Sequence, residues 1–232
     1  MRKLFIIITC ITIVKSGLAQ PIDKNPFTIE KQGIQTTYLL SNWGLSLDVG
    51  GVYYNYDKLT NEYIENHWSG GFSLSVFRKN FSLDCYFNPA TVNVIQPLDF
   101  GYQILEENAN LNVIRTGVLG GYTINLPHYF GVQPQIGLLR TQFLVINEEE
   151  LGLHYTFERT TGAIGSISLN KYFKMRPVGE FLVLHLSGAI AYSNYEKMYH
   201  LLGNSYTFFE IGVGYHGWFR KKKEVKIIDN NI

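Results

Sequence analysis

The sequence has 232 residues, of which 20 are Lys or Arg and 19 are Asp or Glu, and its formal net charge is +1. This near-neutral balance argues against a protein that binds nucleic acid through a basic surface, so no nucleic-acid partner is expected. Aromatic residues make up 15% of the chain and glycine contributes 22 residues.

The N-terminus has the features of a secretory signal peptide in their usual order. A positive start, Arg2 and Lys3, precedes the apolar run Leu4 to Val14, and small residues follow at Ser16-Gly17-Leu18-Ala19. The apolar run of about 11 residues is shorter than the ~20 that a helix needs to span a bilayer. We therefore expect a signal peptide over residues 1–19.

Cys10 lies inside this expected signal peptide, too early in the apolar run to be a lipoprotein cysteine. Cys85 is then the only remaining cysteine, so no intrachain disulfide is expected and Cys85 is interpreted as a small apolar wall residue. No later stretch reaches the length of a spanning helix, so the exported chain is either soluble or a β-barrel.

Alternation of apolar and polar residues dominates the rest of the chain and predicts eight strands. The strands are expected at 38–56, 68–78, 81–87, 111–125, 130–146, 160–173, 179–194 and 206–219. Short turns alternate with long connections that carry most of the acidic residues, at 57–67, 88–110, 147–159 and 195–205. Outer-membrane barrels have tight periplasmic turns and longer outer loops in this way.

Nearly every strand has one apolar and one polar face. In the first strand, for example, Leu45 and Leu47 alternate with Ser46 and Asp48. The polar faces carry the ionisable residues that are assigned to the lumen, namely Asp48, Asp84, Arg115, His185, Glu210 and His216. The strand 130–146 is mixed, and the face of Arg140 is not decided. Lipocalin-like barrels have the apolar face inside, whereas membrane barrels have it outside.

The aromatic residues near the strand ends favour the membrane barrel. The expected periplasmic girdle is Tyr38, Phe77, Phe81, Tyr122, Tyr129, Phe130, Tyr172, Phe173, Phe181, Trp218 and Phe219. The expected outer girdle is Tyr53, Tyr54, Tyr56, Trp68, Phe87, Tyr192, Tyr195, Tyr206 and Phe208. Aromatic rings gather at both membrane–water interfaces. We expect an all-β fold, an up-and-down antiparallel transmembrane β-barrel of about eight strands, in the bacterial outer membrane.

In this pattern the chain resembles the small eight-stranded outer-membrane barrels of the OmpA/OmpX type. The last strand resembles the assembly signal of such barrels, which ends in an aromatic residue, here Phe219. It departs from that signal at Gly217, where a second aromatic residue is usual, and in the residues that follow Phe219. The barrel assembly machinery, outer-membrane lipids and lipopolysaccharide are the expected partners, together with a surface or periplasmic protein.

The expected division of the chain has four parts. A periplasmic N-terminal segment, 20–36, follows the signal peptide, and the barrel covers 37–219. A basic periplasmic tail, 220–232, ends the chain and begins with the run Arg220 to Lys223. This run is interpreted as a solvated terminus beside the membrane, with binding of anionic headgroups or of an anionic partner as the alternative.

Gly212 to Gly217 matches the dinucleotide fingerprint GxGxxG. That fingerprint requires a helix directly after it and an acidic residue about 20 positions on, whereas here the strand continues through Trp218. These glycines are instead expected to let a tightly curved strand close the barrel.

The ionisable lumen residues could line a conduction path or an active site. We favour a packed polar core in which Arg115 pairs with Asp48, Asp84 or Glu210, because eight strands leave a lumen just wide enough for side chains. Glu148-Glu149-Glu150 could bind divalent cations among lipopolysaccharide phosphates, although a solvated loop is favoured. No catalytic, cofactor-binding or metal-binding residue is assigned, and no cofactor is expected.

His185-Leu186-Ser187, with Glu196 downstream, is the one arrangement that could support hydrolysis. Lipid A deacylase barrels carry a similar His-x-Ser, but Asn follows the Ser there and Gly188 follows it here. The pair also belongs to the polar face, away from lipid. The favoured function is therefore a non-enzymatic barrel that anchors exposed loops for surface interaction or envelope maintenance. The alternatives are a narrow pore, a lipid A-modifying enzyme and, with inverted faces, a soluble calycin-like carrier.

Overall fold

The computed structural model describes residues 27–31, 34–101, 103–149, 152–175 and 179–227. The expected signal peptide and most of the 20–36 segment lie outside these residues. Within them, no helix is long and apolar enough to cross a membrane.

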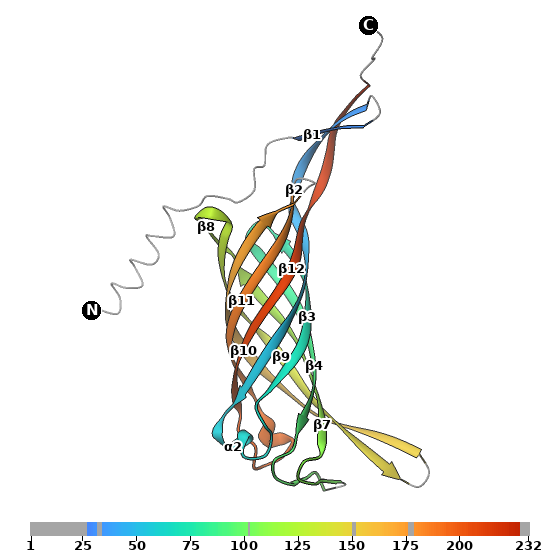
Figure 1. Ribbon diagram of the computed structural model, residues 1–232, viewed down its shortest axis with the longest axis vertical. Helices are drawn as coiled ribbons and strands as arrows, with labels where there is room; N and C mark the ends of the chain where they lie inside the picture. Colours follow the sequence, from blue (N-terminus) through green and yellow to red (C-terminus); the bar gives the residue numbers. More distant parts are fainter. Residues whose placement is uncertain (1–26, 32–33, 102, 150–151, 176–178, 228–232) are drawn as a thin grey trace, which may run out of the picture.

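Eight long strands form a closed antiparallel barrel (Figure 1), and neighbours in the sequence are neighbours in the sheet. The barrel strands are β2 (Ile34–Tyr56), β3 (His67–Arg78), β4 (Phe81–Asn93), β7 (Asn110–Tyr122), β9 (Phe130–Glu149), β10 (Gly152–Lys174), β11 (Glu180–Ser193) and β12 (Ser205–Ile227). A short strand, β8 (Ile124–Leu126), follows β7 and pairs with β9. Pairing of β12 with β2 closes the barrel, so the predicted fold class is confirmed.

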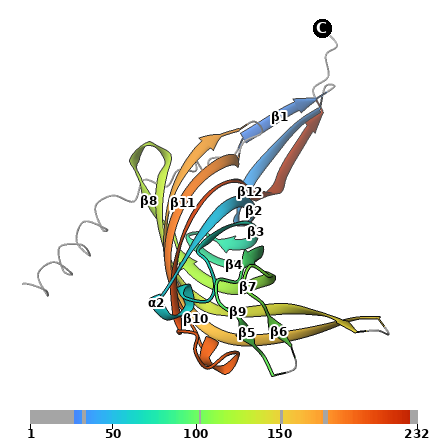
Figure 2. The same ribbon diagram turned by 60° about the horizontal axis from the view of Figure 1, so that its bottom comes forward.

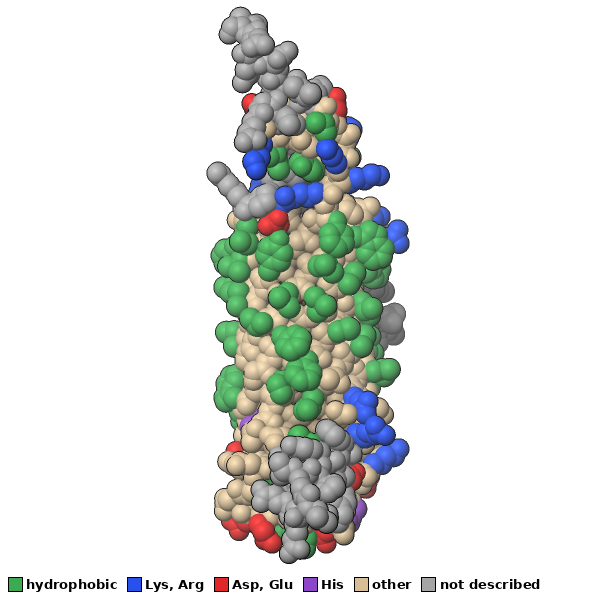
Figure 3. Space-filling view, turned by 90° about the vertical axis from the view of Figure 1, so that its right-hand side faces the viewer, with side chains coloured by type: hydrophobic (Ala, Val, Ile, Leu, Met, Phe, Trp, Pro, Cys, Tyr) green, Lys and Arg blue, Asp and Glu red, His purple; other side chains and the backbone are tan. Residues whose placement is uncertain are grey.

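The apolar face of each strand points outward. Ile136 and Leu138 on β9 are 75% and 72% exposed, whereas Gln133 on the same strand is buried. On the face drawn in Figure 3, hydrophobic side chains cover the middle part of the barrel wall. An apolar band of this extent on barrel strands is what membrane barrels present to the bilayer, and it indicates that this wall faces lipid. This excludes the calycin-like arrangement with the apolar face inside.

Cys85, which the sequence analysis interpreted as a wall residue, and Arg140, whose face it did not decide, also face outward. Cys85 is exposed on β4 and has no disulfide partner, as expected for a wall residue. Arg140, whose face the sequence did not decide, lies on the outward face of β9 with Leu138.

The prediction of two outward aromatic girdles is correct for only part of the set. The outward residues include Trp68, Phe81, Tyr122, Tyr129, Phe130, Phe173, Tyr192 and Phe219. The predicted girdle residues that are instead buried in the lumen are Tyr54, Tyr56, Phe77, Tyr172, Phe181, Tyr195, Tyr206 and Phe208. Most of these lie an even number of residues from polar lumen residues of their own strands, and side chains at such spacings share a face.

The end of the barrel with the short turns, here called the turn end, continues into a small sheet beyond the barrel. The strand β1 (Phe27–Lys31) pairs with the beginning of β2, and β2 also pairs there with β12 up to Ile227. The sequence placed the last strand's end at Phe219, but β12 continues for eight more residues. The pairing of β12 with β2 shifts register between Trp218 and Arg220, at the point where the small sheet leaves the barrel (Figure 1).

The opposite end, here called the loop end, is folded. The expected loop 57–67 contains the short helix α2 (Lys58–Asn61), and 88–110 contains the end of β4 and a hairpin of β5 (Leu98–Asp99) and β6 (Ile104–Leu105). The segment 195–205 contains the 3-10 helix η2 (Tyr195–Lys197). The prediction of a loop at 147–159 was wrong, because β9 and β10 continue as a paired arm that projects sideways from the loop end of the barrel (Figure 2).

If the outward apolar band faces lipid, a charged side chain placed in it should lower the free energy of unfolding. Ile136→Arg should lower the free energy of unfolding in phosphatidylcholine vesicles by roughly 2–4 kcal/mol, the usual cost of Arg near the bilayer midplane. Ile136→Leu is the matched control and should change it by less than about 1.5 kcal/mol. Equal stability of the Arg and Leu variants in urea titrations would contradict an outward, lipid-facing Ile136.

Candidate functional site: the lumen and its aromatic closure

The middle of the lumen carries the predicted ionisable residues. His185 links two carboxylates, with Nε2 at 3.3 Å from Glu210 Oε1 and Nδ1 at 3.8 Å from Asp48 Oδ1. His216 Nε2 lies 3.6 Å from the same Asp48 oxygen, and Ser46 donates a hydrogen bond to Asp48. The histidines, rather than Arg115, therefore face Asp48 and Glu210.

The carboxylate of Asp84 lies in a nest of polar side chains. Ser82 Oγ donates to Asp84 Oδ2 at 3.1 Å, and the amides of Gln133 and Gln135 donate to the same oxygen. Gln133 Oε1 in turn accepts from Asn170 Nδ2 at 3.2 Å. This network satisfies a buried carboxylate with neutral donors, and among the described residues no cation lies within 4 Å of it.

The glycines of β12 make room for these side chains. A Cβ on Gly214 would collide with Asp48 Oδ1, and a Cβ on Gly212 would lie 2.6 Å from His185 Nε2. The sequence attributed these glycines to strand curvature. In the structure they also leave the space into which Asp48 and His185 extend.

Arg115 does not pair with a lumen carboxylate, and that prediction was wrong. The side chain is fully buried nearer the loop end, where its guanidinium carbon lies 3.9 Å from the centre of the Tyr54 ring and 5.6 Å from the rings of Tyr56 and Tyr206. Arg115 Nη2 donates to Tyr56 Oη, and Nη1 lies 3.4 Å from His67 Nε2. The cation is held by aromatic faces, a contact worth about 2 kcal/mol or more when desolvated.

The partners of Arg115 are themselves fixed. His67 Nδ1 lies 3.2 Å from the carbonyl oxygen of Glu65, so this nitrogen is the donor and Nε2 is left to accept from Arg115. The His67 ring stacks on Tyr54 at 5.3 Å, and Tyr54 Oη accepts a hydrogen bond of 2.8 Å from Asn88 Nδ2. These contacts hold the side chains around the Arg115 guanidinium in one arrangement.

Further aromatic rings extend this cluster around Arg115 across the barrel. Tyr195 stacks on Tyr206 at 6.0 Å and on Phe143 at 5.8 Å, and Phe208 contacts Tyr54 at 5.5 Å. We call the whole set the aromatic closure; its members are Tyr54, Tyr56, His67, Arg115, Phe143, Tyr195, Tyr206 and Phe208. These side chains come from five different barrel strands and from η2, so together they fill the cross-section of the lumen near the loop end.

The segments of the loop end pack on the aromatic closure as a cap with its own core. The main buried apolar residues of this cap are Ile64, Val94, Leu98, Leu105, Met198 and Leu202. Asp57 joins two of the segments, because its carboxylate accepts from the backbone amides of Thr60 at 2.9 Å and Ser205 at 2.8 Å. Ile95 N donates to Tyr63 O at 2.7 Å and joins the third.

Below the aromatic closure, the lumen contains a cavity of about 140 Å³. Its walls include Asp48, Asp84 and Glu210, and its lining continues to Lys79 and Asn80 in a turn at the turn end. Arg115 does not line it. At 10–15 Å³ per water, this volume has room for on the order of ten water molecules. The cavity therefore runs from Phe208 of the aromatic closure through the middle of the lumen to the turn end.

His185 and Ser187 share the lumen face of β11, as their spacing predicts, but they are not arranged as a nucleophile and its base. Ser187 Oγ donates to Glu210 Oε2 at 3.3 Å, and His185 contacts the other oxygen of that carboxylate. Glu196 lies in η2, where it accepts from Asn204 Nδ2 at 3.4 Å. Within the described part of the chain, no group of three or more His, Cys, Asp or Glu is arranged to hold a metal ion.

The remaining predicted residues lie outside the lumen. Arg220 forms an ion pair with Glu180, and Lys221, Lys222 and Lys223 are exposed on the extension of β12. Glu150 and the side chains of the two glutamates before it lie outside the described parts of the structure.

Sequence reasoning missed the aromatic closure, although one signal was available. Tyr54 and Tyr56 have the same parity as Asp48 in one strand, and Tyr206 and Phe208 have the parity of Glu210 in another. Strict alternation would have assigned these four aromatic residues to the lumen.

Double-mutant cycles test whether Arg115 is stabilised by the aromatic closure or by a network of lumen carboxylates. Arg115→Met should destabilise the barrel by roughly 2–4 kcal/mol, because the aromatic closure loses its cation and its buried donors. Its coupling with Tyr54→Leu should reach about 0.5–3 kcal/mol, whereas its coupling with Asp84→Asn should stay within about 0.5 kcal/mol. Chemical unfolding of the refolded variants measures both terms. Strong coupling to Asp84 with none to Tyr54 would restore the charge network.

No protein-family model matches the chain, and no curated protein matches it in sequence. The chain is similar in structure to Neisserial surface protein A (TM-score 0.47, 10% identity, 77% of this chain and 98% of that one). It is also similar to OprG from Pseudomonas aeruginosa (TM-score 0.44, 12% identity, 76% of this chain and 96% of that one). A third similar structure is Ail, the attachment invasion locus protein of Yersinia pestis (TM-score 0.42, 13% identity, 77% of this chain and 99% of that one). Its own closed eight-stranded barrel and exposed apolar band identify the chain as a small integral barrel of the bacterial outer membrane.

Proposed function

We propose that this protein is a non-enzymatic barrel with a closed lumen, which anchors its folded cap at the cell surface for interaction with a partner or for maintenance of the envelope. The observation that carries this proposal is the aromatic closure. A buried Arg115 held by several rings blocks the lumen where a channel would have to open. The cap packs on the same side chains, so the barrel serves as its rigid base.

The loop end faces outward in this proposal, and the turn end faces the periplasm. Outer-membrane barrels have short periplasmic turns and longer outer segments, and here the connections Lys79–Asn80 and Thr123–Tyr129 contrast with the cap. The small sheet of β1, β2 and β12 would then lie in the periplasm, together with the exposed Lys221 to Lys223.

The barrel assembly machinery would recognise β12. This strand carries the outward residues Val213, Tyr215 and Phe219, and it closes the barrel against β2. Since β12 continues past Phe219, we propose recognition of an internal stretch of the strand rather than of a terminal aromatic residue.

The two alternative functions receive less support. A pore would use the polar cavity, but the aromatic closure separates that cavity from the loop end. A lipid A-modifying enzyme would need a nucleophile that reaches lipid, and Ser187 is buried on the lumen face. We therefore propose that His185, Ser187 and Glu210 are structural.

Labelling of intact cells tests the display of the cap. In a Cys85→Ser background, Asn61→Cys in α2 should react with a membrane-impermeant maleimide, and Lys174→Cys at the turn end should not, because both positions are exposed but at opposite ends. Lysed cells are the control, in which both should react. Labelling of Lys174→Cys alone on intact cells would reverse the orientation and remove the cap from the surface.

A further inference from the structure

A basic hollow lies on the outer wall of the barrel, at the base of the β9–β10 arm. It is lined by Arg140, Arg159, Thr160, Thr161 and Lys197. Arg140 pairs in register with Thr161, and Arg159 pairs with Gln142, so both arginines lie on the outward face, diagonally across two neighbouring strands. Such diagonal neighbours have Cα atoms roughly 7–8 Å apart, close enough for two long side chains to contact one ligand.

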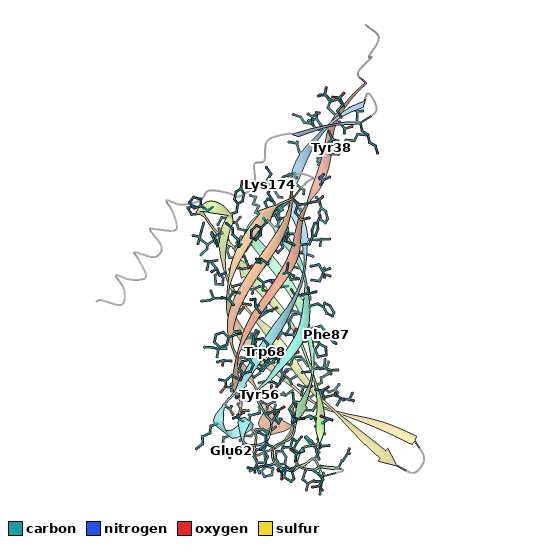
Figure 4. The ribbon with its side chains drawn as sticks, viewed as in Figure 1. Tyr38, Tyr56, Glu62, Trp68, Phe87 and Lys174 are labelled. Atoms are coloured by element: carbon teal, nitrogen blue, oxygen red, sulfur yellow. The ribbon has the colours of Figure 1, made fainter. Side chains whose placement is uncertain are left out.

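The hollow lies at one border of the apolar band. Arg140 follows Ile136 and Leu138 on the outward face of β9, and these two residues are among the most exposed apolar side chains of the band. Figure 3 shows Lys and Arg side chains gathered between the band and the acidic loop end, and Figure 4 shows Trp68 and Phe87 on the same loop-end half of the wall. Lipid headgroups lie at this level, at the edge of the hydrocarbon region.

The three cations of the hollow have no carboxylate within 4 Å among the described side chains. Of the two neighbouring acids, Glu158 pairs in register with the lumen residue Phe143 and so lies on the opposite face of its strand, and Glu196 accepts a hydrogen bond from Asn204. In the orientation that satisfies its donors and acceptors, the Gln142 amide accepts from Arg140 Nε at 3.1 Å and Nη2 at 3.0 Å. This contact orients the guanidinium and leaves its other N–H groups for a ligand.

We propose that this hollow binds a phosphate group of a lipid headgroup in the leaflet that borders the loop end. Guanidinium groups bind phosphate through paired, charge-assisted hydrogen bonds, Lys197 adds a third positive charge, and the exposed Thr161 adds a hydroxyl donor. With the loop end outward, which rests on the proposed function, this lipid is lipopolysaccharide, whose lipid A portion carries phosphates.

Binding of lipid A to the refolded protein in detergent tests the site, since this measurement does not depend on which way the barrel is inserted. The triple variant Arg140→Gln, Arg159→Gln and Lys197→Gln should bind lipid A at least about tenfold more weakly than wild type, because it loses its charge-assisted bonds. The matched control, Lys221→Gln, Lys222→Gln and Lys223→Gln, removes the same charge at the turn end and should bind as wild type does.

Two ligand controls separate the sources of phosphate. Dephosphorylated lipid A should bind wild type as weakly as the triple variant binds lipid A, and millimolar inorganic phosphate should not displace lipid A. Equal loss in the turn-end control, equal binding of the dephosphorylated lipid, or displacement by inorganic phosphate would each overturn the proposal. Heat-dependent gel migration verifies that each variant is folded, and Arg159→Gln alone, at an exposed position, should retain the direction of the effect.

Discussion

Closure of the sheet by β12 against β2 is the constraint on which the rest of this structure depends. A strand in lipid must have all its backbone groups hydrogen-bonded within the protein, because the bilayer core offers no water, and an open sheet edge would leave a row of them unpaired. With eight strands the lumen is only as wide as side chains can fill. The polar side chains of the lumen therefore have to be satisfied within a narrow space, by one another or by water in the cavity.

The lumen meets this requirement in two different ways. In its middle, acids, histidines, amides and hydroxyls satisfy one another around Asp48 and Asp84, and a small cavity remains. Near the loop end, Arg115 is held by aromatic faces and by neutral acceptors instead of carboxylates. Aromatic faces and neutral acceptors take the place that a counter-ion would have here, and Tyr54, Tyr56 and Tyr206 provide them at the base of the cap.

Much of this architecture was readable from alternation, because the side-chain period of a strand is two and one face must meet lipid. The strand positions, the outward Cys85 and the lumen placement of Asp48, Asp84, His185, Glu210 and His216 follow from that period. The partner of Arg115 did not, since parity assigns a face but not a height in the lumen or a neighbour across it.

Pairing between distant segments explains the other differences between the predicted and the observed strands and loops. The arm of β9 and β10 and the extension of β12 carry charged residues that are typical of loops and tails, and only pairing with a neighbouring strand makes them strands. The cap is likewise joined by contacts between segments far apart in the sequence, such as those of Asp57 with Ser205. The basic hollow depends on the same kind of pairing, because only the register of β9 with β10 brings Arg140 and Arg159 together.

The central claim, that the aromatic closure seals the lumen, is tested most directly by single-channel recording of the refolded protein in planar bilayers. Wild type should give no stable conductance steps, because the guanidinium of Arg115 and the rings around it fill the lumen at the loop end. A variant that combines Arg115→Ser, Tyr54→Ser and Tyr206→Ser should give steps, since the polar cavity would then connect to the loop end. Stable, reproducible steps from wild type would contradict the account and favour a pore.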